Sequence, residues 1–210
     1  MRRARLVVLA LMITVVAGCG GESGSVRATH SSNANISRSS ESVYRVPSGS
    51  MEPTLGIGAR VIVSSGALQV GEIVIFHPPE GAEQEECGPT PHVVKLGGAA
   101  CAEPLPSPSS VKFIKRIVAG PGDEVYITEG HVYRRAPGSA SFVREPDTYT
   151  RACGISPECN FPTPITISAD HWYLLGDNRG ESDDSRFWGA IPTSWIVGVV
   201  DAGALKTLVQ

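Results

Sequence analysis

Short runs of valine and isoleucine, each bounded by glycine or proline, constrain the fold of this chain more than any other feature. The runs lie at Ala59 to Ser64, Glu72 to Phe76 and Val111 to Ala119, and Trp172 to Leu175 and Ile196 to Val200 complete the set of expected strands. Segments of this length and composition are typical of β-strands. With 23 Gly and 16 Pro in 210 residues, the composition favours a loop-rich β protein over a helical bundle. We therefore predict a mainly β fold.

A hairpin is expected over Asp123 to Arg134, with its turn at Glu129-Gly130, and Phe142 to Arg144 adds a further strand. Two proline-rich stretches interrupt the strand pattern, at about residues 77–110 and 137–164. The first holds seven Pro, and each stretch contains a pair of cysteines. We expect both to be irregular surface insertions on a single β core.

The N-terminus has the pattern of an export signal. Arginines at positions 2, 3 and 5 precede an apolar stretch over residues 6–16, and Ala17-Gly18-Cys19 follows. Val16-Ala17-Gly18-Cys19, at the end of this segment 1–19, resembles the lipobox of bacterial lipoproteins, in which the signal is cut before a cysteine that carries the lipid. The alternative is a short uncleaved membrane anchor with Cys19 incidental. Either way the rest of the chain is expected outside the cytoplasmic membrane, after a flexible tether over residues 20–42.

The chain has five cysteines, and setting Cys19 aside leaves four that can pair in an oxidising compartment. Proximity favours Cys87 with Cys101 and Cys153 with Cys159 over the two other connectivities. A zinc site is the weaker alternative, because neither pair has C-x-x-C spacing and the five His show no ligand spacing. We therefore expect no metal and no other cofactor.

The charge balance limits the partners. A formal net charge of −3, with 41% hydrophobic and 19% charged residues, resembles neither a disordered tail nor a basic nucleic-acid binder. No nucleic-acid partner is expected. The sequence also lacks an apolar run of about 18 residues, so a full-length transmembrane helix is not evident.

Ser50 lies in a stretch constrained by glycine and proline, Val46 to Leu55, that can present a hydroxyl and its backbone N–H at the floor of a cleft. A serine nucleophile needs a base, and no histidine is placed for that role. Lys115 is the next candidate, because strand alternation puts it on one face with Phe113 and Ile117. Burial there would lower its pKa from about 10.4 toward neutrality. From this segment alone, a solvated strand lysine is the simpler interpretation.

Four segments resemble the sequence boxes of bacterial type I signal peptidases. The stretch 47–55 resembles their serine box, S-x-S-M-x-P-T-L, and 115–123 resembles their lysine box, K-R-x-x-x-x-P-G-D. Residues 176–189 resemble their G-D-N-R…S-x-D-S-R-x-W-G box, and 71–76 match the G-D-x-V-x-F strand with Glu72 in place of Asp. The boxes occur in the family's order and at sensible spacing.

The resemblance implies a role for each polar residue of these boxes. Ser50 would be the nucleophile and Lys115 the general base. Ser48 and the backbone N–H of Ser50 would form the oxyanion hole, and Ser182 would orient the Lys115 amine.

Two further sets of residues follow from the resemblance. Asp184 and Arg186 would form a supporting ion pair. The wall of the substrate pocket would consist of Val46, Pro47, Met51, Leu55, Phe113 and Ile114. Such a wall, by resemblance, selects small residues at positions −1 and −3 of the cut site.

The likeness implies a signal-peptidase-like β fold with disulfide-stapled insertions, in which residues 43–202 are the catalytic domain and 203–210 a tail. Family members commonly carry transmembrane anchors close to the serine box, whereas here a lipobox and a tether come first. The spacing of Cys153 and Cys159 is that of a disulfide in some members. Candidates for an aromatic collar that contacts membrane lipid are Trp188, Trp195 and Phe161, for which core packing is the expected role.

The leading hypothesis is therefore a signal peptidase I, a serine endopeptidase that cuts exported preproteins at the outer face of the cytoplasmic membrane. One alternative is a maturation protease for a single dedicated substrate, as in conjugation systems. A self-cleaving repressor shares the Ser/Lys β fold, but the export signal and the missing DNA-binding region count against it. The non-enzymatic alternative is a lipoprotein binding module that has lost activity, against which the retention of Ser50, Lys115 and Ser182 argues.

Overall fold

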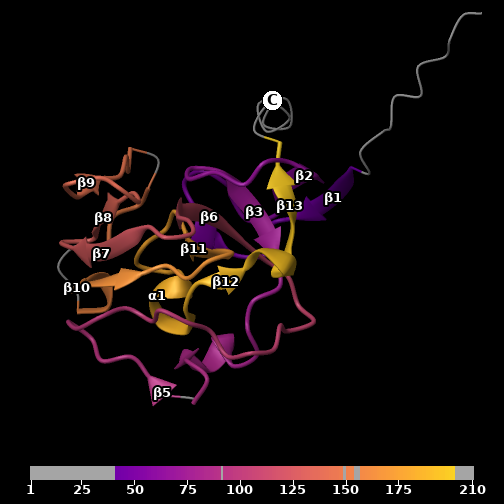
Figure 1. Ribbon diagram of the computed structural model, residues 1–210. Coiled ribbons are helices and arrows are strands. Elements are labelled where there is room, and N and C mark those ends of the chain that lie inside the picture. The colour runs from indigo at the N-terminus through magenta and orange to yellow at the C-terminus, as the bar shows by residue number, and fades with distance from the viewer. Residues whose placement is uncertain (1–40, 91, 149, 154–156, 202–210) are drawn as a thin grey trace, which may run out of the picture. The chain divides into compact units, whose positions relative to one another are not determined.

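The computed structural model describes residues 41–90, 92–148, 150–153 and 157–201. These residues form a seven-stranded sheet, a four-stranded sheet and a two-stranded ribbon, joined by short helical turns (Figure 1). All the strand pairings of these sheets are antiparallel. The prediction of a mainly β fold is confirmed.

Some predictions concern residues outside the described ranges. They are the signal or anchor segment 1–19 with Cys19, the tether 20–42 apart from its last two residues, and the tail 203–210. Ser42, which was expected to end the tether, is already the first residue of a strand. None of the helices in the described ranges has the length and apolar character needed to cross a membrane.

The seven-stranded sheet carries the lysine strand at an inner position. Its strands, in spatial order, are β1 (Ser42–Arg45), β2 (Arg60–Ser64), β13 (Ile196–Val200), β3 (Ile73–Phe76), β6 (Phe113–Ala119), β11 (His171–Leu175) and β12 (Ile191–Pro192). Lys115 of β6 lies opposite Val74 of β3, and Arg116 lies opposite Leu175 of β11. Residues 114–119 are buried on both faces of the strand. Side chains of β6 are therefore held between packed layers.

The four-stranded sheet is built around the predicted hairpin. Its order is β10 (Phe161–Thr166), β7 (Glu124–Thr128), β8 (His131–Arg135) and β9 (Val143–Arg144). The turn between β7 and β8 is Glu129-Gly130, as predicted, and both residues have positive φ angles of 51° and 75°. Those angles match the two-residue turn that the right-handed twist of a hairpin favours.

Residues 137–164 are not irregular throughout. They include β9, which confirms the strand expected at Phe142 to Arg144, and they run into β10, which was not expected and pairs with β7 through Phe161 and Ile127. The prolines of β10 obscured the strand in the sequence. They are tolerated because β10 lies at the edge of its sheet, where a missing N–H breaks few ladder bonds.

The stretch 77–110 is not confined to the surface either. It forms η2 (Ala82–Gln84), β4 (Glu86–Cys87) and β5 (His92–Val93), and it buries small apolar side chains in the larger core. The buried members are Ala82, Cys87, Val94, Ala100 and Cys101. The insertion lies against α1 (Ser185–Trp188), where the Cys101 N–H donates to the Arg186 carbonyl over 2.9 Å (Figure 1).

Both predicted disulfides, Cys87–Cys101 and Cys153–Cys159, are present. The first closes the insertion at the point where it meets α1. The second lies beside η3 (Pro157–Cys159), just before β10.

Two apolar clusters meet at β6. The larger contains Ile117 and Val118 together with the fully buried Trp188 and Phe161, which are therefore core residues. Trp195 of η4 (Thr193–Trp195) is partly buried against the same cluster. The smaller cluster contains Ile114 with side chains of β2, β3 and η1 (Gly49–Met51). In β6, Lys115 and Arg116 stand between Ile114 of the smaller cluster and Ile117 of the larger one.

Candidate active site

Ser50 lies in a single helical turn, η1, that two buried residues hold in place. Met51 is fully buried and Leu55 is 3% exposed, and the Leu55 N–H donates to the Met51 carbonyl over 2.9 Å. Both side chains pack in the smaller core and line none of the cavities described below. Sequence reasoning had placed Met51 and Leu55 in the substrate wall. Here they anchor the turn that presents the Ser50 hydroxyl.

Lys115 reaches the Ser50 hydroxyl from β6. Its Nζ lies 2.8 Å from Ser50 Oγ, and the side chain passes over the ring of Phe113 at 5.6 Å from the centroid. Lys115 is 4% exposed, and this burial lowers the pKa of its amine from 10.5 to about 8, against the opposing effect of nearby carboxylates. An amine with such a pKa is available in its neutral form near neutrality and can accept the hydroxyl proton.

The loop after β11 holds the serine turn by its backbone. The Asn178 N–H donates to the Ser50 carbonyl over 3.0 Å, and the Asn178 side-chain amide donates to the Gly49 carbonyl over 3.2 Å. These bonds fix the turn on both sides of the Ser50 Cα.

Asp177 ties the same loop to both catalytic segments. One carboxylate oxygen accepts from Arg116 Nε over 2.8 Å, and the other accepts from Arg116 Nη2 and from the Thr54 hydroxyl, each over 2.6 Å. Arg116 is the neighbour of Lys115, and Thr54 belongs to the serine segment. Thr54, Arg116 and Asp177 all lie within the sequence boxes, but no role was predicted for them. Their pairing joins positions far apart in the chain, and no local pattern signals it.

The predicted ion pair between Asp184 and Arg186 is present. Arg186 Nε and Nη2 donate to the two carboxylate oxygens over 2.8 and 3.0 Å, and both side chains are buried. Asp184 also caps α1 and accepts from the Gly176 N–H over 3.1 Å. Arg186 holds the pKa of the Asp184 carboxyl below its usual range although burial acts in the opposite direction. Asp184 therefore stays ionised, and its charge raises the pKa of Lys115 more than the Arg186 charge lowers it.

Ser182 lies behind the dyad, packed against Gly176. A Cβ on Gly176 would overlap the Ser182 hydroxyl and lie 2.5 Å from the Ser50 carbonyl oxygen, so this position requires glycine. The Ser182 hydroxyl has no hydrogen-bond partner among the described residues. Its orientation of the Lys115 amine stays a prediction.

Ser48 precedes the turn and is exposed, with its Oγ 3.3 Å from Ser50 Oγ. A hydroxyl at this distance can swing toward an oxyanion formed above Ser50. The structure thus brings together Ser48, Ser50 and Lys115, which the sequence separates by up to 67 positions.

The cleft above the dyad continues into apolar space. A cavity of about 320 Å³ contains Ser50 and Lys115 in its lining, together with Pro47, Phe113 and Ile114. A neighbouring cavity of about 180 Å³ shares those last three residues and adds Val46 to its lining. Four of the six predicted wall residues therefore line this space: Val46, Pro47, Phe113 and Ile114.

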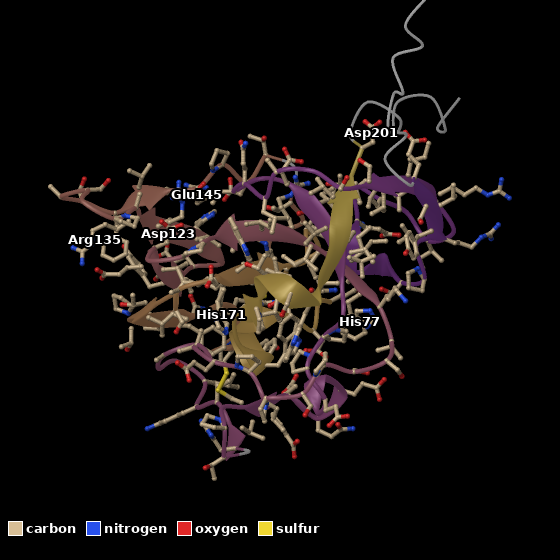
Figure 2. The ribbon with its side chains drawn as sticks, turned by 45° about the vertical axis from the view of Figure 1, so that its right-hand side comes forward. His77, Asp123, Arg135, Glu145, His171 and Asp201 are labelled. Atoms are coloured by element: carbon tan, nitrogen blue, oxygen red, sulfur yellow. A yellow bond between two sulfur atoms is a disulfide. The ribbon has the colours of Figure 1, made fainter. Side chains whose placement is uncertain are left out.

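The histidines of the described chain make their polar contacts elsewhere. His77 pairs with the Ser109 carbonyl and His171 with the Ala169 carbonyl, and Figure 2 shows the two well apart. Within the described ranges, no group of three His, Cys, Asp or Glu side chains is arranged to hold a metal ion.

Comparison with known proteins assigns the chain to a peptidase family. Residues 35–204 match the family described as signal peptidase, peptidase S26. A probable signal peptidase I-1 of Synechocystis sp. is 33% identical over 159 residues, which cover 73% of this chain and 65% of that protein. A signal peptidase I of Leptolyngbya laminosa is 31% identical over the same share of this chain and 63% of its own length. The chain belongs to the signal peptidase, peptidase S26 family.

A plant relative and a solved structure extend the comparison. A probable thylakoidal processing peptidase of Arabidopsis thaliana is 33% identical over 73% of this chain and 35% of its own length. A signal peptidase I structure from Enterococcus faecalis covers 66% of this chain and 100% of its own, with 18% identity and a TM-score of 0.39. The chain spans less than two thirds of the length of the cyanobacterial relatives.

Proposed function

We propose that this protein is a serine endopeptidase of the signal peptidase I type, in which Ser50 is the nucleophile and Lys115 the general base. The observation that carries the proposal is the 2.8 Å approach of a buried amine, with a pKa of about 8, to a hydroxyl held in a fixed turn. Family membership supports the same reaction.

The reaction needs one proton acceptor and one oxyanion site. Neutral Lys115 takes the proton of Ser50 as Oγ attacks the substrate carbonyl, and the resulting ammonium returns a proton to the leaving amine. The backbone N–H of Ser50 and the Ser48 hydroxyl stabilise the negative charge on the carbonyl oxygen. A water molecule, activated by the same amine, then releases the acyl group from Ser50.

The proposed substrates are exported preproteins with small residues at −1 and −3. In an extended peptide, alternate side chains point to one face, so the −1 and −3 side chains enter the cleft together while −2 points away. The −1 residue occupies the cavity at Ser50 and the −3 residue the neighbouring cavity lined by Val46 and Ile114. Apolar walls that cannot relax exclude bulky side chains.

Attachment to the outer face of the cytoplasmic membrane through a lipid on Cys19 is part of the proposal. The lipobox-like end of residues 1–19 and the polar composition of residues 20–42 support it. Fatty-acid labelling of cells should mark the wild-type chain and leave Cys19→Ser unlabelled. Equal labelling of the two chains would contradict lipid attachment at this residue.

The direct test is cleavage of a preprotein by the full chain in detergent. Ser50→Ala and Lys115→Ala should each lower kcat by several orders of magnitude, and the double variant should be scarcely slower, because the two groups act as a unit. Lys115→Arg should fail too, since a guanidinium keeps its proton. Ser139→Ala, a change at an exposed serine beyond β8, is the matched control and should cleave normally.

Two outcomes of that test would change the proposed function. Full activity in a folded Lys115→Ala variant would overturn the dyad. Cleavage of one preprotein out of a varied panel would favour the dedicated maturation protease over a general signal peptidase.

A further inference from the structure

The catalytic cleft continues past the dyad into a second, polar cavity. This cavity measures about 490 Å³ and shares Glu181 and Asp183 with the lining of the cleft that contains Ser50 and Lys115. The apolar cavity that includes Val46 shares its residues with the other part of the cleft. The three cavities therefore form a continuous series. It runs from the apolar cavity at Val46, through the cleft at Ser50, to the polar cavity.

Three separate parts of the chain line the polar cavity: two facing walls and, between β9 and β10, Glu158 of η3. One wall is the loop that ends in α1, and it includes Ser182, Asp183 and Phe187. The facing wall comes from the disulfide-closed insertion and includes Glu85 and Leu96. Because the insertion is bonded to α1 through the Cys101 N–H and the Arg186 carbonyl, the two walls are fixed relative to each other.

Carboxylates dominate the charge of this lining. Four acidic side chains contribute to it, namely Glu85, Glu158, Glu181 and Asp183, against the guanidinium groups of Arg179 and Arg186. The Arg186 group already faces the buried Asp184, and its third nitrogen donates to the Glu158 carbonyl over 3.2 Å. The cavity thus presents a net negative lining.

Two residues of the same lining, Ser182 and Asp183, carry buried polar atoms without a hydrogen bond in the described part of the chain. The Ser182 hydroxyl is buried, with the residue 7% exposed, and has no hydrogen-bond partner among the described residues. Asp183 Oδ1 is likewise buried without a hydrogen bond of good geometry in that part of the chain, although Lys115 and the Trp188 indole act on this carboxyl. Burial together with the negative charge of Asp184 raises the pKa of Asp183 to about 7, a cost that a neighbouring cation would remove.

The order of the cavities indicates which part of a substrate each would bind. If the residues before the cut fill the apolar cavities, the residues after the cut extend from Ser50 in the opposite direction and pass over Asp183. We propose that the polar cavity binds the first three residues of the leaving segment and favours a lysine or arginine among them. This inference rests on the proposed function.

A basic side chain fits the lining at both of its ends. Leu96 and Phe187 offer apolar surface to the methylene stem, while Glu85 and Asp183 face the charged head. An acidic side chain would meet the same carboxylates as like charges. A neutral side chain would leave them without a new partner.

The test is a set of peptides with one Ala-x-Ala cut site and with Lys, Ala or Glu at each of the three positions after the cut. The full chain in neutral detergent at low salt should cut the best Lys peptide about fivefold faster in kcat/KM than its Ala parent, and the matching Glu peptide more slowly than that parent. The preference should fall in about 1 M salt, which screens exposed charges.

Two variants locate the effect. Glu85→Gln should lower the Lys-to-Glu ratio of rates. Glu83→Gln, a change two residues earlier in η2 and outside the cavity, should keep it. Because the readout is a ratio within one enzyme, a general loss of activity cancels. Equal rates at all three positions, or an unchanged ratio in Glu85→Gln, would overturn the inference and leave the proposed function standing. Failure to cut the alanine parent would overturn both.

Discussion

Arginine–carboxylate pairs with the same closest approach occur beside both sheets, but their surroundings differ. Arg116 and Asp177, at the seven-stranded sheet, approach to 2.6 Å with side chains 10% and 0% exposed. Arg135 and Glu124, on the four-stranded sheet, approach to the same 2.6 Å but are 34% and 32% exposed, and Figure 2 shows Arg135 at the outer edge. Distance alone therefore does not say what such a pair does.

Burial and connection separate the two cases. Asp177 also accepts from Thr54, and its neighbour Asn178 holds the Ser50 turn, so the buried pair fixes the relative position of serine and lysine. Breaking a buried pair leaves a charge without compensation, while an exposed pair is worth about 0–1 kcal/mol. The buried pair is expected to position the site. The exposed pair is expected to contribute little to stability or to the site.

The largest effect should come from breaking the buried pair. Asp177→Ala should lower the free energy of unfolding by about 3–5 kcal/mol and remove most of the cleavage activity, because Arg116 stays buried and the Thr54 contact is lost. The matched change Glu124→Ala should cost less than about 1 kcal/mol and keep the activity. Denaturant unfolding and peptide cleavage measure both, and equal effects of the two changes would erase the distinction.

The disulfides provide the next comparison. Replacing Cys87 and Cys101 by Ala opens a loop with a sequence separation of 14, against 6 for Cys153 and Cys159. Chain entropy predicts losses of about 3 and about 2 kcal/mol. Since the first bridge closes the insertion against α1, its removal should also weaken the proposed preference for basic residues. Thermal unfolding of the two double variants gives the order, and a larger loss for the shorter loop would contradict it.

A single methyl group can test how tightly the site is packed. Gly176→Ala should lower kcat/KM about a hundredfold, because the new Cβ collides with the Ser182 hydroxyl and the Ser50 carbonyl. Gly56→Ala is the control, since a Cβ there meets nothing within 4 Å. Wild-type rates in Gly176→Ala would show that the serine turn can shift freely.

The smallest expected effect is electrostatic. Asp183→Asn removes a carboxylate that raises the pKa of Lys115, so the pKa should fall and the rising limb of the pH profile should move to lower pH. Glu124→Gln, on the other sheet, should leave the limb in place. A shift toward higher pH in Asp183→Asn would mean that Asp183 does not act on the lysine through its charge.

The strands could be predicted from local pattern, whereas the proximity of Ser50 and Lys115 was expected only from the resemblance to the signal peptidase boxes. Val/Ile runs marked β2, β3, β6 and β13, and the four boxes placed Ser50 and Lys115 within reach of each other. The pair of Arg116 with Asp177 could not be predicted, because 61 positions separate the partners and each residue alone looks like an exposed charge.

Long-range packing also decides two features that composition alone did not resolve. Met51 and Leu55 have the apolar character of a pocket wall, and only the fold shows that they face the core. The insertion 77–110 reads as irregular because its apolar residues are small and scattered, yet it supplies a wall to the polar cavity. The sequence marks such segments by composition and says nothing of what they pack against.

The pH dependence of kcat/KM on a neutral peptide tests the central claim most directly. Catalysis requires the neutral amine, so the rate should rise with pH through an apparent pKa of about 8, the value that burial gives Lys115. At pH 7 only about a tenth of the amine is neutral, which leaves the enzyme well below its limiting rate. Two results would contradict Lys115 as a buried general base. The rate could rise through an apparent pKa of about 6.5, the ordinary value of a histidine, or of about 10.4, the value of a solvated lysine.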